Sequence, residues 1–133
     1  MPQVPLFTIT EPTELLALWR LVAEAKFSEA PDDADLWGSP FVHTLANRIA
    51  DAMLESYRLK GDLQAAARHE EWLNSLSRNV ALPVIKSHLK RDASTEAWRK
   101  RSLEEKIHYV RGCIAPFRAN QDFLVGLVRA AEA

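Results

Sequence analysis

Hydrophobic and polar residues alternate with a helical period along most of the chain, and residues 39–61 show this pattern best. Ser39 is suited to cap a helix, Pro40 to take its first position and Gly61 to end it in the left-handed conformation. At about 100° per residue the apolar side chains share one side of this helix: Phe41, Val42, Leu45, Ala46, Ile49, Met53 and Tyr57. The stretch therefore predicts an amphipathic helix that packs one face into a core.

The same pattern continues on both sides of this helix, and no strand-like alternation of useful length accompanies it. Further helices are predicted over residues 13–27, 62–79, 83–91, about 92–117 and 120–133. Pro116 is expected to kink or end the helix that contains it. The chain is thus predicted to be all-α, a compact bundle of about five to six helices in a single domain, residues 1–133.

Two segments lack the helical pattern. Residues 1–10 contain two prolines and are predicted to form an extended arm that packs its apolar side chains on the bundle. Residues 28–39 form an acidic loop in which Leu36 and Trp37 stand out. Large aromatic side chains are usually at least partly buried, so these two are expected to fold back on the core. The alternative is that they contact a partner.

The first predicted helix is apolar around most of its circumference. Only Glu14, Arg20 and Glu24 form a narrow polar strip; the apolar positions are Leu15, Leu16, Leu18, Trp19, Leu21, Val22 and Phe27. A helix of this kind is either central in its fold or covered by another subunit. Because few helices can be fully surrounded in a bundle of 133 residues, we expect a homodimer with this helix near the interface and Trp19 as an anchor.

Composition is ordinary for a soluble globular domain, with 47% hydrophobic and 26% charged residues. The single cysteine, Cys113, excludes an intramolecular disulfide and favours a reducing compartment. No apolar stretch approaches the ~20 residues that cross a bilayer. The start of the chain does not resemble a secretory signal. We therefore expect a cytoplasmic protein with no membrane association.

A basic segment, residues 78–101, supports an alternative function. Clustered cations bind nucleic-acid backbones by releasing counterions. The cations of this segment are Arg78, Lys86, Lys90, Arg91, Arg99, Lys100 and Arg101. The competing interpretation is a solvated or intramolecularly paired face.

The histidines suggest a third function, since helical bundles build metal sites from ligands on facing helices. His69 and His88 lie on apolar faces and His43 at the margin of one, so these three could converge. Otherwise His69 and His88 are each expected to be a buried neutral imidazole bonded to a backbone carbonyl or to each other. Glu105 and His108 match the Glu-x-x-His spacing of di-iron bundles but are predicted to face solvent.

The preferred hypothesis is a small soluble helical protein that acts by protein–protein interaction, in an adaptor, regulatory or inhibitor role, as a homodimer. Its predicted partner-binding residues are Trp19, Leu36 and Trp37. The alternatives are nucleic-acid binding through residues 78–101 and a metal-dependent enzyme that uses the three histidines. No catalytic residue and no cofactor are assigned.

Overall fold

The computed structural model describes residues 7–133, which form seven α-helices, two short 3-10 helices and no strand. The predicted all-α bundle is therefore confirmed. The elements are α1 (Pro12–Phe27), η1 (Ala34–Leu36), α2 (Pro40–Leu59), α3 (Leu63–Leu73), η2 (Leu76–Arg78), α4 (Ala81–Ala93), α5 (Glu96–Arg99), α6 (Leu103–Cys113) and α7 (Gln121–Glu132). None of the helices in this range is both long and apolar enough to span a membrane.

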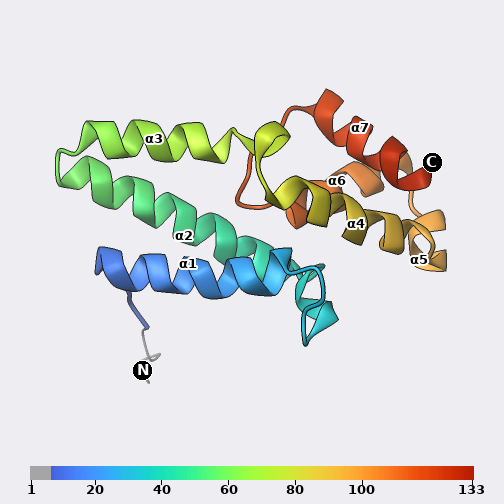
Figure 1. Cartoon of the computed structure of the whole chain (residues 1–133), viewed down its shortest axis with the longest axis horizontal. Helices are drawn as coiled ribbons and strands as arrows, with labels where there is room; N and C mark the ends of the chain where they lie inside the picture. The colour runs from blue at the N-terminus through green and yellow to red at the C-terminus, as the bar shows by residue number, and fades with distance from the viewer. Residues whose placement is uncertain (1–6) are drawn as a thin grey trace, which may run out of the picture.

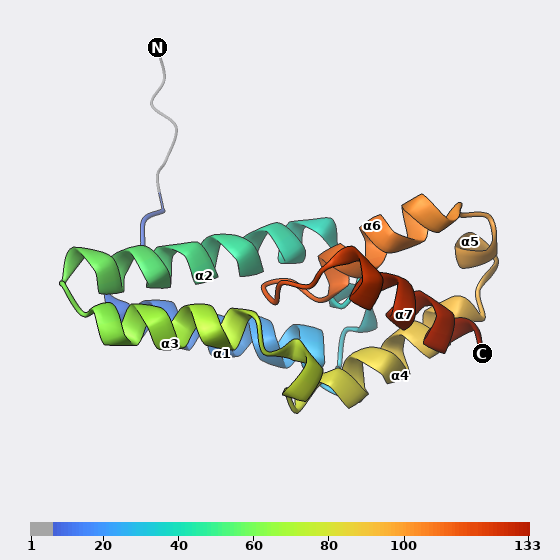
Figure 2. The same ribbon diagram turned by 90° about the horizontal axis from the view of Figure 1, so that it is seen from above.

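The helices form an elongated molecule with two ends (Figures 1 and 2). Helix α2 runs antiparallel to both α1 and α3, and these three make one end, while α4 to α7 make the other. Val22 on α1, Ala46 and Ile49 on α2, and Ala115 just after α6 form a small apolar cluster. The larger cluster fills the other end: Trp37, Leu76, Ile85, Leu89, Trp98, Ile107, Val110, Cys113, Ile114, Phe117, Leu124, Leu127, Val128 and Ala131.

Local signals set the bounds of α2 as predicted. The hydroxyl of Ser39 accepts a hydrogen bond from the Val42 amide at 3.4 Å. Gly61 has a φ of +73°, the left-handed conformation that ends a helix at low cost for glycine. Asp62 then caps α3 by accepting from the Ala65 amide at 3.0 Å. These caps connect α2 and α3 into an antiparallel helical hairpin.

Two predicted helices are divided in the structure. The helix expected over 62–79 ends at Leu73 and gives way to η2. The helix expected over 92–117 is split because Thr95 caps α5 and Ser102 caps α6, each through its hydroxyl. Serine and threonine hydroxyls satisfy free amides at helix starts better than they fit helix interiors. Helix α6 ends at Cys113, shortly before Pro116.

Four apolar residues that the helical pattern turned inward are exposed instead: Phe41, Leu45, Val80 and Leu103. All except Leu45 stand in the first turn of a helix or directly before one. The angular position of a residue does not say whether a neighbouring helix extends far enough to cover it. Of the predicted arm, residues 1–6 lie outside the described residues, and Phe7 is exposed.

Candidate functional site

A buried lysine lies where α1, α2 and the end of α6 meet. Lys26 is 0% exposed, and its Nζ lies 3.0 Å from the Gly112 carbonyl, 2.8 Å from the Ala115 carbonyl and 3.0 Å from Nδ1 of His43. These three acceptors match the three N–H groups of a lysine ammonium, but none of them carries a charge. Burial lowers the pKa of Lys26 to about 7.

The imidazole of His43 is the side chain that accepts a hydrogen bond from Lys26. Because the ammonium donates to Nδ1, the proton of the neutral imidazole resides on Nε2 while Lys26 is charged. This Nε2 is buried and has no hydrogen-bond partner among the described residues. Burial and then the charge of Lys26 lower the pKa of His43 to about 4. The ring therefore presents an unused donor.

Gly112 makes room for this ring. A Cβ atom on Gly112 would lie 2.6 Å from Cδ2 and 3.2 Å from Nε2 of His43, which is too close for real side chains. The backbone of α6 at Gly112 therefore packs directly against the imidazole of His43. A glycine inside a helix lowers its stability by roughly 0.5–1 kcal/mol relative to alanine, and here the close approach explains its presence.

His43 and Gly112 form part of the wall of a surface pocket of about 320 Å³ between α2 and α6. Six further residues complete it: Pro40, Thr44, Asn47, His108, Tyr109 and Arg111. Among these described residues there is no Asp or Glu. The exposed Arg111 forms no ion pair with any residue in 7–133. The pocket is therefore lined by a cation, two histidines and neutral polar groups.

A hydrogen-bonded carboxylate lies behind Tyr109. Asp92 Oδ2 accepts from the Tyr109 hydroxyl at 2.7 Å and from Trp37 Nε1 at 2.9 Å. Burial raises the pKa of Tyr109 well above its ordinary value, so the phenol stays a donor. Burial also raises the pKa of the Cys113 thiol to about 12. A thiol held in its protonated form is a poor nucleophile.

The three histidines of the predicted metal site do not come together. Nε2 of His69 donates to the Ala50 carbonyl at 3.0 Å, and Nε2 of His88 donates to the Ser28 carbonyl at 2.7 Å, while His43 contacts Lys26. Within residues 7–133 no three potential ligands are grouped to hold a metal ion. His69 and His88 thus follow the alternative interpretation, a buried imidazole bonded to a carbonyl. Glu105 and His108 are exposed, as predicted.

The predicted partner-binding residues pack largely against other residues of the same chain. Trp37 is 2% exposed and belongs to the larger core, where its ring lies 4.7 Å from that of His88 and its indole N–H is bonded to Asp92. It is therefore not available on the surface, and the acidic loop folds back onto the core. Leu36 is half-buried. Trp19 is also half-buried, with its ring edge-on to that of Trp72 at 5.3 Å.

The basic segment has many internal contacts. Arg78 faces Glu71 at 3.6 Å and Lys100 faces Glu96 at 3.4 Å. The guanidinium of Arg101 lies 4.3 Å from the centre of the Tyr109 ring. Arg91 bonds Nδ1 of His88, and Arg99 bonds the backbone carbonyls of Ser94 and Thr95. Only Lys86 and Lys90, both exposed on α4, have no such partner in the described chain.

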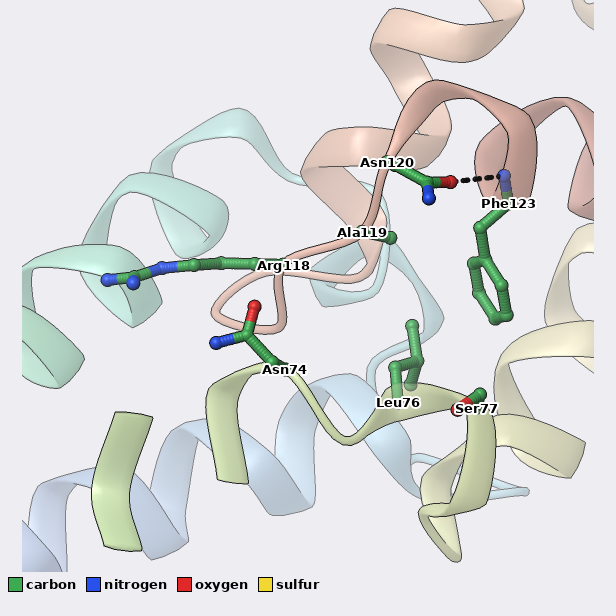
Figure 3. A pocket seen from close by; sticks show the side chains of 7 residues that line it. All are labelled: Asn74, Leu76, Ser77, Arg118, Ala119, Asn120 and Phe123. Carbon is green, nitrogen blue, oxygen red and sulfur yellow. Dashed lines mark hydrogen bonds between the residues drawn. The ribbon is translucent and has the colours of Figure 1, made fainter. Parts of the chain in front are cut away.

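A second pocket, of about 450 Å³, lies between the end of α3 and the segment before α7 (Figure 3). Two of its polar side chains are already engaged: Asn120 accepts from the Phe123 amide at 2.9 Å, and Asn74 donates to the Glu70 carbonyl at 2.8 Å. Arg118 extends away from the other lining residues. This pocket brings no unsatisfied polar groups together.

The fold and these contacts define a small all-α protein with a buried lysine–histidine pair beside a polar pocket. Comparison with protein-family models, curated proteins and solved structures finds no match to the chain.

Proposed function

We propose that this protein acts by protein–protein interaction and forms a homodimer through one side of the α1–α2 pair. The observation that carries the proposal is an apolar surface left uncovered there. Leu21 is 69% exposed, Phe41 87% and Leu45 39%. We call this surface the α1–α2 face; it consists of these three residues and the half-buried Leu18 and Val42.

Helix geometry supports placing these residues on the same side. Helix α3 covers the other side of both helices, as the contacts of Trp19 with Trp72 and of Ala50 with His69 indicate. Leu21 follows Trp19 by two residues, about 200° around α1, and Leu45 precedes Ala50 by five, about 140° around α2. Both therefore point away from α3.

The register of the two helices supports the same arrangement. Lys26 meets His43, and Val22 packs with Ala46 one turn further along the antiparallel pair. Leu21 and Leu45 directly precede the two members of this second pair, so in the antiparallel arrangement they are offset along the helix axes by only about 3 Å. Leu18 and Val42 extend the surface along each helix.

The exposed apolar area is sufficient for a modest dimer. The exposed fractions of Leu21, Phe41 and Leu45 add up to the surface of about two whole apolar residues. Burying one such side chain stabilises a complex by roughly 2 kcal/mol. Two-fold symmetry counts every contact twice, which gives about 8 kcal/mol before the cost of association. With the lowest cost of association, about 4 kcal/mol, the expected dissociation constant is on the order of millimolar.

Sedimentation velocity tests this proposal. The wild-type chain is expected to sediment as a concentration-dependent dimer, whereas Leu21→Asp should sediment as a folded monomer. Val80→Asp is the matched control, because Val80 is 91% exposed but lies before α4, away from this surface. A wild-type chain that shows no concentration-dependent association up to about 1 mM, close to the expected dissociation constant, would contradict the proposal. So would equal disruption by the control.

An adaptor, regulatory or inhibitor role follows from such an interface, since it brings no reacting groups together. The buried free thiol of Cys113 supports a reducing, cytoplasmic location.

A further inference from the structure

We propose that the pocket between α2 and α6 binds a small oxyanion, with Arg111 as its charged anchor and the Nε2–H of His43 as its buried hydrogen-bond donor. The pocket is lined by Thr44 and Asn47 on α2, whereas the α1–α2 face lies on the other side of that helix. The inference is therefore independent of the proposed dimer.

The charge around the pocket favours an anion. Arg111 has no carboxylate partner in the described chain, and His108 precedes it by three residues on the same face of α6. Two carboxylates lie close to the lining residues without lining the pocket. Asp92 lies behind Tyr109 and accepts its hydroxyl, and Glu104, one turn before His108, shares the adjoining pocket with His108 and Arg111 but forms no ion pair with Arg111. Arginine binds carboxylate, sulfate and phosphate groups through paired hydrogen bonds.

The buried floor of the pocket points to the same chemistry. His43 forms part of the pocket wall and is only 9% exposed, and its buried Nε2 lacks a hydrogen-bond partner in the described chain. A buried donor left unsatisfied costs free energy, which an acceptor atom of a ligand would recover. Behind the ring, Lys26 is a buried cation whose three partners are all uncharged. An anion in the pocket would supply the missing opposite charge.

The start of α2 adds a further favourable field. Pro40, the first residue of this 20-residue helix, lines the pocket together with residues of the next two turns. The amino end of a helix carries roughly half a positive charge. The volume of about 320 Å³ is at the lower end for small-molecule sites. The site therefore suits a compact ligand that carries a carboxylate or a tetrahedral oxyanion.

Nuclear magnetic resonance titration tests the site with two probes, sodium sulfate and sodium acetate, each against sodium chloride at constant ionic strength. The amide signals of Thr44, Asn47 and Gly112 are expected to shift and saturate, with a dissociation constant on the order of millimolar for at least one probe. Saturation by sulfate alone indicates a tetrahedral ligand, and saturation by acetate indicates a carboxylate. If neither probe causes more change than chloride, the proposal is refuted.

Two surface variants separate the site from general charge effects. Arg111→Gln should weaken binding about ten- to a hundredfold, as expected for the loss of a charged hydrogen bond. Arg129→Gln removes another exposed arginine, from the last turn of α7, and should leave binding unchanged. If the two variants behave alike, binding at the pocket is excluded.

The pH dependence tests the part of His43. Lys26 faces His43 and the Cys113 thiol, and that thiol stays protonated because its pKa is raised to about 12. Lys26 loses its proton above a pKa of about 7, so sulfate affinity should fall between pH 7 and 9, by at most about a hundredfold. Sulfate keeps its charge over this range. Lys26→Met should remove that fall. A wild-type affinity that does not change would show that the buried Lys26–His43 pair does not contribute to binding.

Discussion

The buried ammonium of Lys26 makes the stability of this protein depend on pH in an unusual direction. In the unfolded chain Lys26 has the ordinary lysine pKa of 10.5, whereas burial lowers its pKa to about 7 in the folded protein. Between these values the unfolded state binds more protons than the folded state. The free energy of unfolding should therefore rise with pH, by about 1.4 kcal/mol per pH unit.

Two other buried groups limit the range of this gain. Cys113 has its pKa raised from 9.0 to about 12 and Tyr109 has its pKa raised from 10.0. Each stays protonated in the folded protein while it ionises in the unfolded chain, so each opposes the gain above its ordinary pKa. The net increase is thus confined to pH 7–9 and amounts to about 2–3 kcal/mol. Stability should level off above pH 9 and fall above pH 10.

Urea unfolding at pH 7, 8 and 9, followed by circular dichroism, measures this increase. Lys26→Met keeps the length and apolar stem of the side chain but cannot titrate, so its free energy of unfolding should be nearly constant over the range. Lys86→Met, at an exposed site on α4, should retain the wild-type slope. A slope that persists in Lys26→Met, or that is absent from the wild type, would show that Lys26 is not the titrating group.

Two further predictions concern the glycines and the acid side of the stability curve. Gly112→Ala should destabilise the fold by about 1–3 kcal/mol, because its Cβ would overlap His43. Gly126→Ala, where a Cβ meets nothing within 4 Å, should stabilise α7 by about 0.5–1 kcal/mol. Thermal melts of the two variants measure both effects, and equal changes in melting temperature would contradict the prediction. Burial lowers the pKa of His43 to about 4 and lowers those of His69 and His88. Stability should therefore fall as pH drops from about 6.5 towards 4, and a flat melting temperature over this range would refute it.

The helices themselves could be predicted because their signals are local. A serine, proline or aspartate acts on amides within one turn, and the caps at Ser39, Gly61 and Asp62 lie where the pattern placed them. The outward direction of Glu105 and His108 was also predictable, since it follows from the apolar stripe of a single helix.

The candidate site was less accessible to sequence reasoning. Lys26 stands in the last turn of an apolar helix, where a lysine ordinarily interacts with solvent and the helix dipole, so nothing nearby marks it as buried. Its acceptors, Gly112 and Ala115, lie 86 and 89 residues further along the chain. An isolated glycine inside α6 was the one signal of a close approach, but it does not name the ring that approaches.

The sequence alone determined which segments become helices and which side of most of them is apolar, because those properties depend on neighbours within a few residues. Only the tertiary structure decided how far each helix is covered, which leaves Leu21 and Phe41 exposed and buries Trp37. It also brought Lys26, His43 and Gly112 together. Those contacts depend on how whole helices pack. Packing brings together residues that are far apart in the sequence, and no local sequence pattern predicts such contacts.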